Sequence, residues 1–337
     1  MNMKKINLLI FLLVLPFFSS GNMPGEKKLQ FKEDRTFKIV QFTDTHYNHE
    51  SSKSEVVIEN IRKILKAENP DLVIFTGDIV THAPVSKGWQ EITAPLVERE
   101  IHWCVTLGNH DEEHDKSRKE ILNLLANISY NHTRSGASNI YGWGNYVLKI
   151  KGHQSDKTEV LIYCMDSNAY TPIEGVGTYG WFQLSQINWY VETSNRHIRR
   201  NNGKPLPALA FFHIPLPEYV EAWNSGDRAP IGVKNEEVCA PAINTGMYAA
   251  MLQQGDVMAT FAGHDHVNDY VAPLHGLAMI YGRFSGGGDT YGDLRNGARV
   301  IEITEGERAF ITWIRLREGE KLREVKYKKD HIINLEP

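Results

Sequence analysis

The sequence has few cysteines. Its 337 residues include three, at Cys104, Cys164 and Cys239. A small and odd number of thiols argues against a disulfide framework. Cys104 and Cys164 fall inside apolar segments, where we expect them to be core residues, whereas Cys239 lies in a loop-like stretch.

The sequence also lacks an excess of charge of either sign. Acidic and basic residues are interspersed, and the formal net charge is −4. Nucleic-acid-binding proteins usually present a basic face, so this balance gives no indication of a nucleic-acid partner. No repeat or low-complexity tract interrupts the chain. With 42% apolar residues, we expect residues 22–337 to form one α/β domain with a large core.

The apolar run near the N-terminus is short. It covers residues 6–18, fewer than the roughly 20 residues that a membrane-spanning helix needs. Lys4 and Lys5 precede it and Ser19-Ser20-Gly21 follows it, the order typical of a secretory signal peptide. We therefore predict a signal peptide over residues 1–21, export to the periplasm or the cell exterior, and no stable membrane span in the mature chain. An uncleaved N-terminal anchor is the alternative.

Short apolar runs recur along the rest of the chain and alternate with helical patterns. The runs are predicted strands at 37–42, 71–76, 102–107, 159–165, 208–213, 257–262, 277–282, 298–303 and 309–314. Near-continuous apolar strands indicate burial on both faces of a sheet. The strands after residue 277 have no long helix between them, so we expect hairpins there.

Three helices are predicted between these strands. In the first, apolar residues recur at helical spacing from Val57 to Leu65. Ser52 and Glu55 have the spacing of a capping box at its start, and Asn69-Pro70 ends it. The other two are predicted over residues 117–127 and 182–200.

Five of the apolar runs end in Asp, Asn or His. In open α/β sheets, ligands bind at the carboxyl ends of strands, so residues far apart in sequence can meet there. The candidate metal ligands are Asp44, His46, Asp78, Asn109, His213, His264 and His266. Gly77, Gly108 and Gly263 stand beside them and allow close backbone approach.

These seven donors are too many for one tetrahedral ion but suit two ions that share a bridging carboxylate. Imidazole and oxygen donors without thiolate fit iron, manganese or zinc. Paired ions typically promote in-line displacement at phosphorus. The alternative for any single strand end is an ordinary turn or helix cap.

The ordered set of motifs resembles the calcineurin-like metallophosphoesterase superfamily. The motifs are Asp44-Thr45-His46, Gly77-Asp78, Gly108-Asn109-His110-Asp111, His213 and Gly263-His264-Asp265-His266. The stretches "GVGTYGWFQLSQINWY", "FFHIPLPEY" and "GHDHVNDY" are similar to plant purple-acid-phosphatase-like and fungal phosphatases. The resemblance implies a four-layer α/β/β/α sandwich, in which helices flank two mixed β-sheets.

The resemblance also implies a role for each ligand. The first ion is expected to bind Asp44, His46 and His266. The second is expected to bind Asn109, His213 and His264, and Asp78 would bridge the two. Thr81 stands where purple acid phosphatases have a tyrosine ligand, so His46 would replace that donor.

The implied activity is metal-dependent hydrolysis of a small-molecule phosphate ester. Two divalent or trivalent ions would activate a water for attack on phosphorus. His110 would stabilise the transition state or protonate the leaving oxygen, and Asp111 would fix the tautomer of His110 or cap the next helix. A phosphomonoester is the expected substrate; phosphodiester or pyrophosphate hydrolysis, or an inactive binding protein, are the alternatives. Loops 82–100, 112–140, 167–182 and 214–246 are expected to decide specificity.

Other polar and aromatic residues have two interpretations each. His49, His82 and His114 lie near predicted ligands in sequence. They could reach a substrate phosphate or could be solvated loop residues. Tyr179, Trp181 and Phe182 could line a pocket or pack in the core. Asp265 is expected to be structural.

Overall fold

The computed structural model describes residues 28–287, 292–328 and 330–336. The signal peptide predicted over residues 1–21 lies outside the described residues and stays a prediction. Within the described ranges, no helix is both long and apolar enough to cross a membrane.

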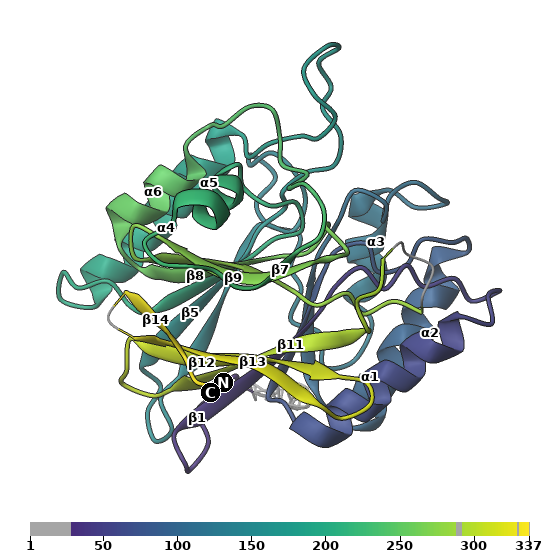
Figure 1. The fold of residues 1–337 in the computed structure, drawn as a ribbon, viewed down its shortest axis with the longest axis horizontal. Helices are drawn as coiled ribbons and strands as arrows, with labels where there is room; N and C mark the ends of the chain where they lie inside the picture. Colours follow the sequence, from purple (N-terminus) through teal and green to yellow (C-terminus); the bar gives the residue numbers. More distant parts are fainter. Residues whose placement is uncertain (1–27, 288–291, 329, 337) are drawn as a thin grey trace, which may run out of the picture.

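Two mixed β-sheets lie face to face, and helices cover the outer face of each (Figure 1). The first sheet has the order β14-β13-β12-β11-β1-β2-β3. Its strands are β1 (Thr36–Phe42), β2 (Leu72–Thr76), β3 (His102–Thr106), β11 (Gly297–Thr304), β12 (Ala309–Leu316), β13 (Lys321–Lys328) and β14 (His331–Asn334). The helices on its outer face are α1 (Ser54–Glu68), α2 (Val85–Glu98) and α3 (Arg118–Leu125).

The second sheet has the order β4-β5-β6-β8-β10-β9-β7. Its strands are β4 (Tyr146–Lys151), β5 (Thr158–Cys164), β6 (Ala208–Phe211), β7 (Ile231–Lys234), β8 (Val257–Ala262), β9 (Asn268–Leu274) and β10 (Leu277–Tyr281). The helices on its outer face are α4 (Leu184–Arg200), α5 (Glu218–Ser225) and α6 (Met247–Gln254).

Alternation of side chains along the strands builds the layers. In β3, Trp103 and Val105 pack against the helices, whereas Cys104 between them packs into the core shared by the two sheets. Cys164 of the second sheet joins the same shared core, with its Sγ atom 3.8 Å from that of Cys104. Both sheets are therefore buried on two faces, and the predicted four-layer α/β/β/α sandwich is confirmed.

The parallel strands place several strand ends at one edge. β1, β2 and β3 are parallel to one another, and so are β5, β6, β8 and β10. β11 runs antiparallel to β1 and begins a series of hairpins through β14. The hairpins predicted for the C-terminal strands are confirmed from β11 onward, whereas β10 pairs with β9 in the second sheet and forms no hairpin with β11.

The first helix starts differently from the prediction. α1 begins at Ser54, with Lys53 before it and no side-chain cap, so the capping box predicted at Ser52 and Glu55 is wrong. The Ser54 hydroxyl instead accepts the Asn48 N–H at 3.0 Å and holds the preceding loop. A capping box does form at the start of α3, between Ser117 and Glu120.

The helix α2 occupies most of residues 82–100, so the loop predicted there is wrong, whereas a role of this segment in specificity stays a prediction. Gly88 and Pro95 lie inside it, and both have poor helix propensity, which obscured the pattern. Tertiary packing explains Gly88, because a Cβ atom there would lie 2.4 Å from Cγ1 of Val80. Trp89 is fully buried and anchors the helix to the sheet.

A buried ionic cluster ties the two sheets together. Asp269 of β9 accepts hydrogen bonds from Arg299 of β11 at 2.9 Å, from Arg323 of β13 at 2.5 Å, and from Arg283. Asp269 and Arg299 are fully buried. Burial lowers the pKa of Arg299 to about 10, and the Asp269 carboxylate opposes this decrease. The carboxylate thus balances positive charge that would otherwise be buried alone.

We predict that Asp269→Asn destabilises the fold by about 3–5 kcal/mol, because it leaves buried guanidinium groups without their counter-charge. Chemical denaturation followed by circular dichroism measures the change. The control is Glu307→Gln, which removes an exposed carboxylate 3.8 Å from Lys328 and should cost at most about 0.5 kcal/mol. Equal stabilities for the two variants would contradict the prediction.

Candidate metal centre

The predicted ligands follow strands of both sheets and meet at one edge of the sandwich. Asp44 and His46 follow β1, Asp78 follows β2 and Asn109 follows β3. From the second sheet, His213 follows β6, and His264 and His266 follow β8. The structure therefore brings together donors that are up to 222 positions apart in the sequence, from Asp44 to His266.

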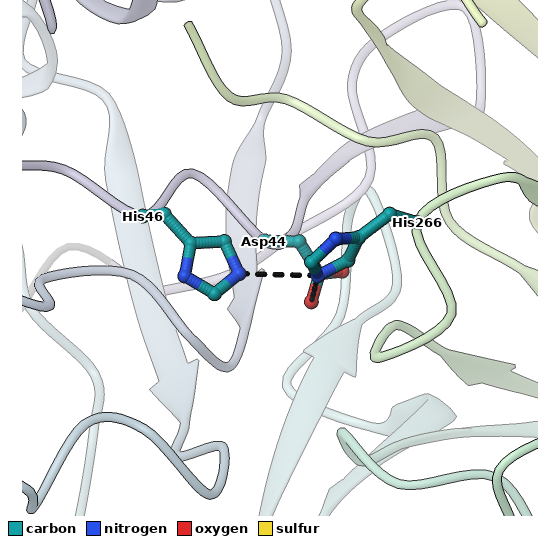
Figure 2. A group of neighbouring side chains, drawn as sticks. All are labelled: Asp44, His46 and His266. Atoms are coloured by element: carbon teal, nitrogen blue, oxygen red, sulfur yellow. Dashed lines mark hydrogen bonds and ion pairs between the residues drawn. The ribbon is translucent and has the colours of Figure 1, made fainter. Parts of the chain in front are cut away.

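The first group consists of Asp44, His46 and His266, whose ligand atoms lie within 4.8 Å of one another (Figure 2). The Nε2 atoms of His46 and His266 are 3.1 Å apart. Nε2 of His266 is also 3.5 Å from Oδ1 of Asp44. Figure 2 shows the two rings turned toward the same point beside the carboxylate.

The second group consists of Asp78, His213 and His264, again with ligand atoms within 4.8 Å. Nε2 of His213 lies 3.1 Å from Oδ2 of Asp78 and 3.3 Å from Nδ1 of His264. Nδ1 of His213 is 2.8 Å from the Thr76 carbonyl, a contact that only an N–H can make favourably. This bond places an N–H at Nδ1 and directs Nε2 toward Asp78, where a bound metal ion would take the place of the Nε2 proton. Asp44 joins the groups, because its Oδ1 is 4.0 Å from Nε2 of His213.

The residues present fit two metal ions. Oδ1 of Asn109 and Nε2 of His264 are buried and have no hydrogen-bond partner in the described structure. The Asn109 amide Nδ2 donates to the Tyr170 hydroxyl at 3.2 Å, which leaves the amide oxygen available to a metal ion. Buried polar atoms normally have partners. Carboxylate, imidazole and amide donors that converge in this way match the preferences of iron, manganese and zinc.

Burial and mutual attraction shape the charges of the second group. Burial opposes ionisation of Asp78, but the nearby histidines, His213 first, more than offset it and hold the pKa of Asp78 well below its usual range. Burial likewise opposes protonation of His213, yet Asp78 raises the pKa of His213 to about 9. Burial and the positive charge of His213 lower the pKa of His264 to about 3. His264 is therefore neutral near pH 7 and can offer a lone pair.

The backbone at the centre is strained. Four ligands have positive φ angles: Asp44 (51°), His46 (42°), Asp78 (53°) and His264 (75°). Residues other than glycine rarely adopt this conformation, which costs on the order of 1–3 kcal/mol each. The surrounding sandwich imposes these angles, and they turn successive side chains toward one point.

Glycines permit the close approach of the loops. A Cβ atom on Gly108 would lie 2.2 Å from Oδ1 of Asp78, and one on Gly263 would lie 1.9 Å from Oγ1 of Thr43. Side chains at these positions would displace the loops that carry the ligands. The role predicted for Gly108 and Gly263 is confirmed.

Asp111 supports the loop of Asp78 and does not contact His110. Its fully buried carboxylate accepts the backbone N–H groups of Gly108 at 2.7 Å, Asp78 at 3.0 Å and Ile79 at 2.9 Å. Burial and the neighbouring Asp78 charge raise the pKa of Asp111 to about 6. The predicted role of orienting His110 is wrong, and so is the alternative of a helix cap, because Ser117 caps α3.

Glu113 takes the position beside His110 that was predicted for Asp111. Its Oε2 is 2.7 Å from Nδ1 of His110, and its Oε1 accepts the Tyr170 hydroxyl at 2.6 Å. Tyr170 in turn contacts Asn109, so a chain of contacts joins a predicted ligand to His110. Sequence reasoning missed Glu113 and Tyr170. The spacing of three residues between His110 and Glu113 was the available signal.

Of the other residues considered in the sequence, some lie beside the metal centre and others lie in the hydrophobic core or elsewhere. The Tyr179 ring lies edge-on against His264, with centroids 4.4 Å apart, so it borders the centre. Phe182 is buried in the core under α4. Asp265 is buried and accepts hydrogen bonds from Tyr281 and from the backbone of Cys239, which agrees with its predicted structural role. His49 and His82 lie together in a separate group with Glu50.

Known proteins are similar to this chain over most of its length. The family model described as calcineurin-like phosphoesterase matches residues 37–268. "Probable inactive purple acid phosphatase 14" of Arabidopsis thaliana is 32% identical over 84% of this chain and 78% of that protein. "Phosphatase DCR2" of Saccharomyces cerevisiae is 29% identical over 88% of this chain and 56% of that protein. The solved structure of a dimetal phosphatase from Danio rerio shares the fold, with a TM-score of 0.59 at 13% identity, over 87% of this chain and 98% of that one.

We predict that Gly108→Ala lowers the metal content, because the added methyl group displaces Asp78 while the sandwich persists. Elemental analysis of the purified variant should show the loss of at least one metal equivalent per chain. The control is Gly306→Ala, which, unlike Gly108, has a positive φ, and whose added Cβ would meet no atom within 4 Å. That variant should lose about 1–2 kcal/mol of stability and keep its metal. Full metal content in Gly108→Ala would contradict the prediction.

Proposed function

This chain belongs to the calcineurin-like phosphoesterase family, as its motifs predicted, and from that membership we propose that it is an active, metal-dependent phosphomonoesterase. We further propose that it acts outside the cytoplasm, following the signal peptide predicted from residues 1–21. Phosphodiesters and pyrophosphates remain alternative substrates of the same centre.

The observation that carries the proposal is the completeness of the site. All seven predicted ligands lie at one edge of the sandwich, six of them in two groups of three. His110 stands beside them, with its ring centroid 5.6 Å from that of His46 and 40% of its side chain exposed. A partly exposed imidazole next to buried ligands is available to a substrate.

Two bound metal ions would supply Lewis acidity, which stabilises charge on the phosphoryl oxygens and makes water a better nucleophile at neutral pH. Asp44, His46 and His266 would hold one ion, Asn109, His213 and His264 would hold the other, and Asp78 would bind both. His213 presents Nε2 in a fixed orientation because Nδ1 is bound to the Thr76 carbonyl.

His110 is positioned to act on the leaving group. Its Nδ1 faces the Glu113 carboxylate at 2.7 Å, so Nε2 is directed away from Glu113. The Glu113 carboxylate can only accept, so this contact places an N–H at Nδ1 of His110. In the protonated form, His110 can donate a proton from Nε2 to the leaving oxygen. Glu113 is therefore a positioning residue, held in turn by the Tyr170 hydroxyl.

A cavity of about 670 Å³ adjoins the centre at Asn109 and offers a place for the leaving group. Tyr141, Trp143 and Tyr170 line it, together with Glu112 and Glu113.

The cavity offers little to a polyanion. Among the described residues that line it, Arg118 is the only cation. The Arg118 guanidinium already donates to Asp166 at 2.7 Å, to Glu112 at 3.2 Å and to the Gly108 carbonyl at 2.8 Å. A leaving group that carries additional negative charge would meet carboxylates without a free counter-charge. This balance favours neutral, aromatic or cationic leaving groups over a polyphosphate.

The names of two similar plant proteins favour a second candidate function, a metal-binding protein without catalytic activity. Plant relatives are named probable inactive phosphatases, and a chain of this fold could bind metal without turnover. Catalysis by His110 is the point on which the two candidates differ.

We predict that the metal-loaded chain hydrolyses p-nitrophenyl phosphate faster than bis-p-nitrophenyl phosphate. His110→Ala should keep its metal and lose roughly 10²–10⁴-fold in kcat, as expected when an acid–base group is removed. Glu113→Gln should lose less, because it alters the orientation of His110 but not its presence. Steady-state kinetics and elemental analysis of the same samples give both quantities.

The control for this series is His114→Ala, which removes an exposed histidine from the same loop and should leave kcat unchanged. If His110→Ala loses its metal, the role given to His110 is wrong. If no variant differs from the wild type because neither ester turns over, the non-catalytic candidate is correct.

We predict that the cavity discriminates leaving groups by charge. Phosphoethanolamine and phosphoglycolate have leaving groups of similar size and opposite charge, so they form a matched pair. Screened attraction or repulsion of about 1 kcal/mol should favour phosphoethanolamine by roughly fivefold in kcat/KM. A preference for phosphoglycolate would show that the leaving group does not enter this cavity.

A further inference from the structure

A second cluster of metal-binding side chains lies beyond the seven ligands. The ligand atoms of His49, Glu50 and His82 are within 4.8 Å of one another. We propose that these three residues bind one divalent transition-metal cation of the zinc class, separate from the two ions of the phosphoesterase centre.

The backbone holds the two histidines side by side. Tyr47 and Val80 form a parallel β-bridge, and His49 and His82 each stand two residues beyond it. The Tyr47 N–H donates to the Ile79 carbonyl at 2.8 Å, and the Thr81 N–H donates to the Tyr47 carbonyl at 3.2 Å. As a result the ring centroids of His49 and His82 are 5.2 Å apart. The site is therefore organised by main-chain bonds that do not depend on the histidines themselves.

A local turn directs the carboxylate toward these rings. The Asn48 side chain accepts the Glu50 N–H at 2.9 Å, and the Ser54 hydroxyl accepts the Asn48 N–H at 3.0 Å. Oε2 of Glu50 then lies 3.2 Å from Nε2 of His82. Because 68% of the Glu50 side chain is exposed, an ion pair with His82 alone would contribute little to stability.

An unsatisfied nitrogen points to a ligand. Nδ1 of His49 is buried and has no hydrogen-bond partner in the described structure. Leaving such an atom unpaired costs about 1–3 kcal/mol, and coordination of a cation would remove this cost. Two imidazoles and one carboxylate form a known zinc-binding set that leaves the fourth position open to water.

The position of the cluster gives a cation there a structural effect. His49 lies in the loop that carries Asp44 and His46, and His82 lies in the loop that carries Asp78. A cation bound by both histidines would cross-link these two loops close to the strained ligands. His114 does not belong to this trio, although its ring centroid is 6.3 Å from that of His82.

The test is a Zn²⁺ titration of the full chain, followed by gel filtration and elemental analysis. We expect three zinc equivalents in the wild type and two in His82→Ala. His114→Ala is the matched control and should retain three. Glu50→Gln changes an exposed side chain and cannot disturb the core. It should weaken the third equivalent at least tenfold, since even indirect ligand partners contribute 10–100-fold to affinity. Co²⁺ loading gives an independent readout, because the visible absorption of the ion reports its coordination.

Two results would overturn the proposal. One is a wild type that binds no more than two equivalents. The other is a third equivalent that is retained in His82→Ala or is lost equally from His114→Ala. Zinc content is measured apart from ester hydrolysis, so these results stand whether or not the chain is an active phosphoesterase.

Discussion

The burial of two carboxylates, Asp44 and Asp78, is the constraint on which the site depends. Both are 99% buried, and an uncompensated charge there would cost several kcal/mol. Both carboxylate oxygens of Asp44 accept the backbone N–H of His264 at 3.1 Å. The Asp78 carboxylate accepts the backbone N–H of His110 at 2.8 Å and lies 3.1 Å from Nε2 of His213. Loops from both sheets are thus bound to the same two carboxylates, which helps hold His213 and His264 of the second sheet beside the ligands of the first.

Positive φ angles and glycines, which usually destabilise a fold, are needed around these two carboxylates. Asp44 and His46 accept positive φ angles, and Gly108 approaches Asp78 more closely than any other residue could. Both carboxylate oxygens of Asp111 accept hydrogen bonds from backbone N–H groups, and two of these groups lie in the loop of Asp78. The ionic cluster around Asp269 helps hold the two sheets in place across the core. Strain at the centre is therefore balanced by bonding in the surrounding scaffold.

Most of the candidate ligands could be predicted from the sequence, because each stands directly after an apolar strand pattern that is visible in a few consecutive residues. The ligand motifs directly follow apolar runs, so their convergence at a sheet edge followed from the strand pattern. Contacts set by tertiary packing were harder to predict. Asp111 was assigned to His110 as its neighbour in sequence, yet its carboxylate turns back to the Asp78 loop, and Glu113 contacts the ring instead. The helix α2 was not predicted because Gly88 and Pro95, which have low helix propensity, lie inside it.

The account of the centre is tested most directly by hydrolysis of p-nitrophenyl phosphate as metal is returned to the chelated chain. The chain to use is His82→Ala, which is expected to bind metal at this centre alone. Because each ion is assigned its own set of ligands and Asp78 is assigned to both, the account predicts that turnover appears as about two equivalents are bound and then reaches a plateau. A chain that binds two equivalents and hydrolyses no phosphate ester would contradict the proposal that this centre is catalytic.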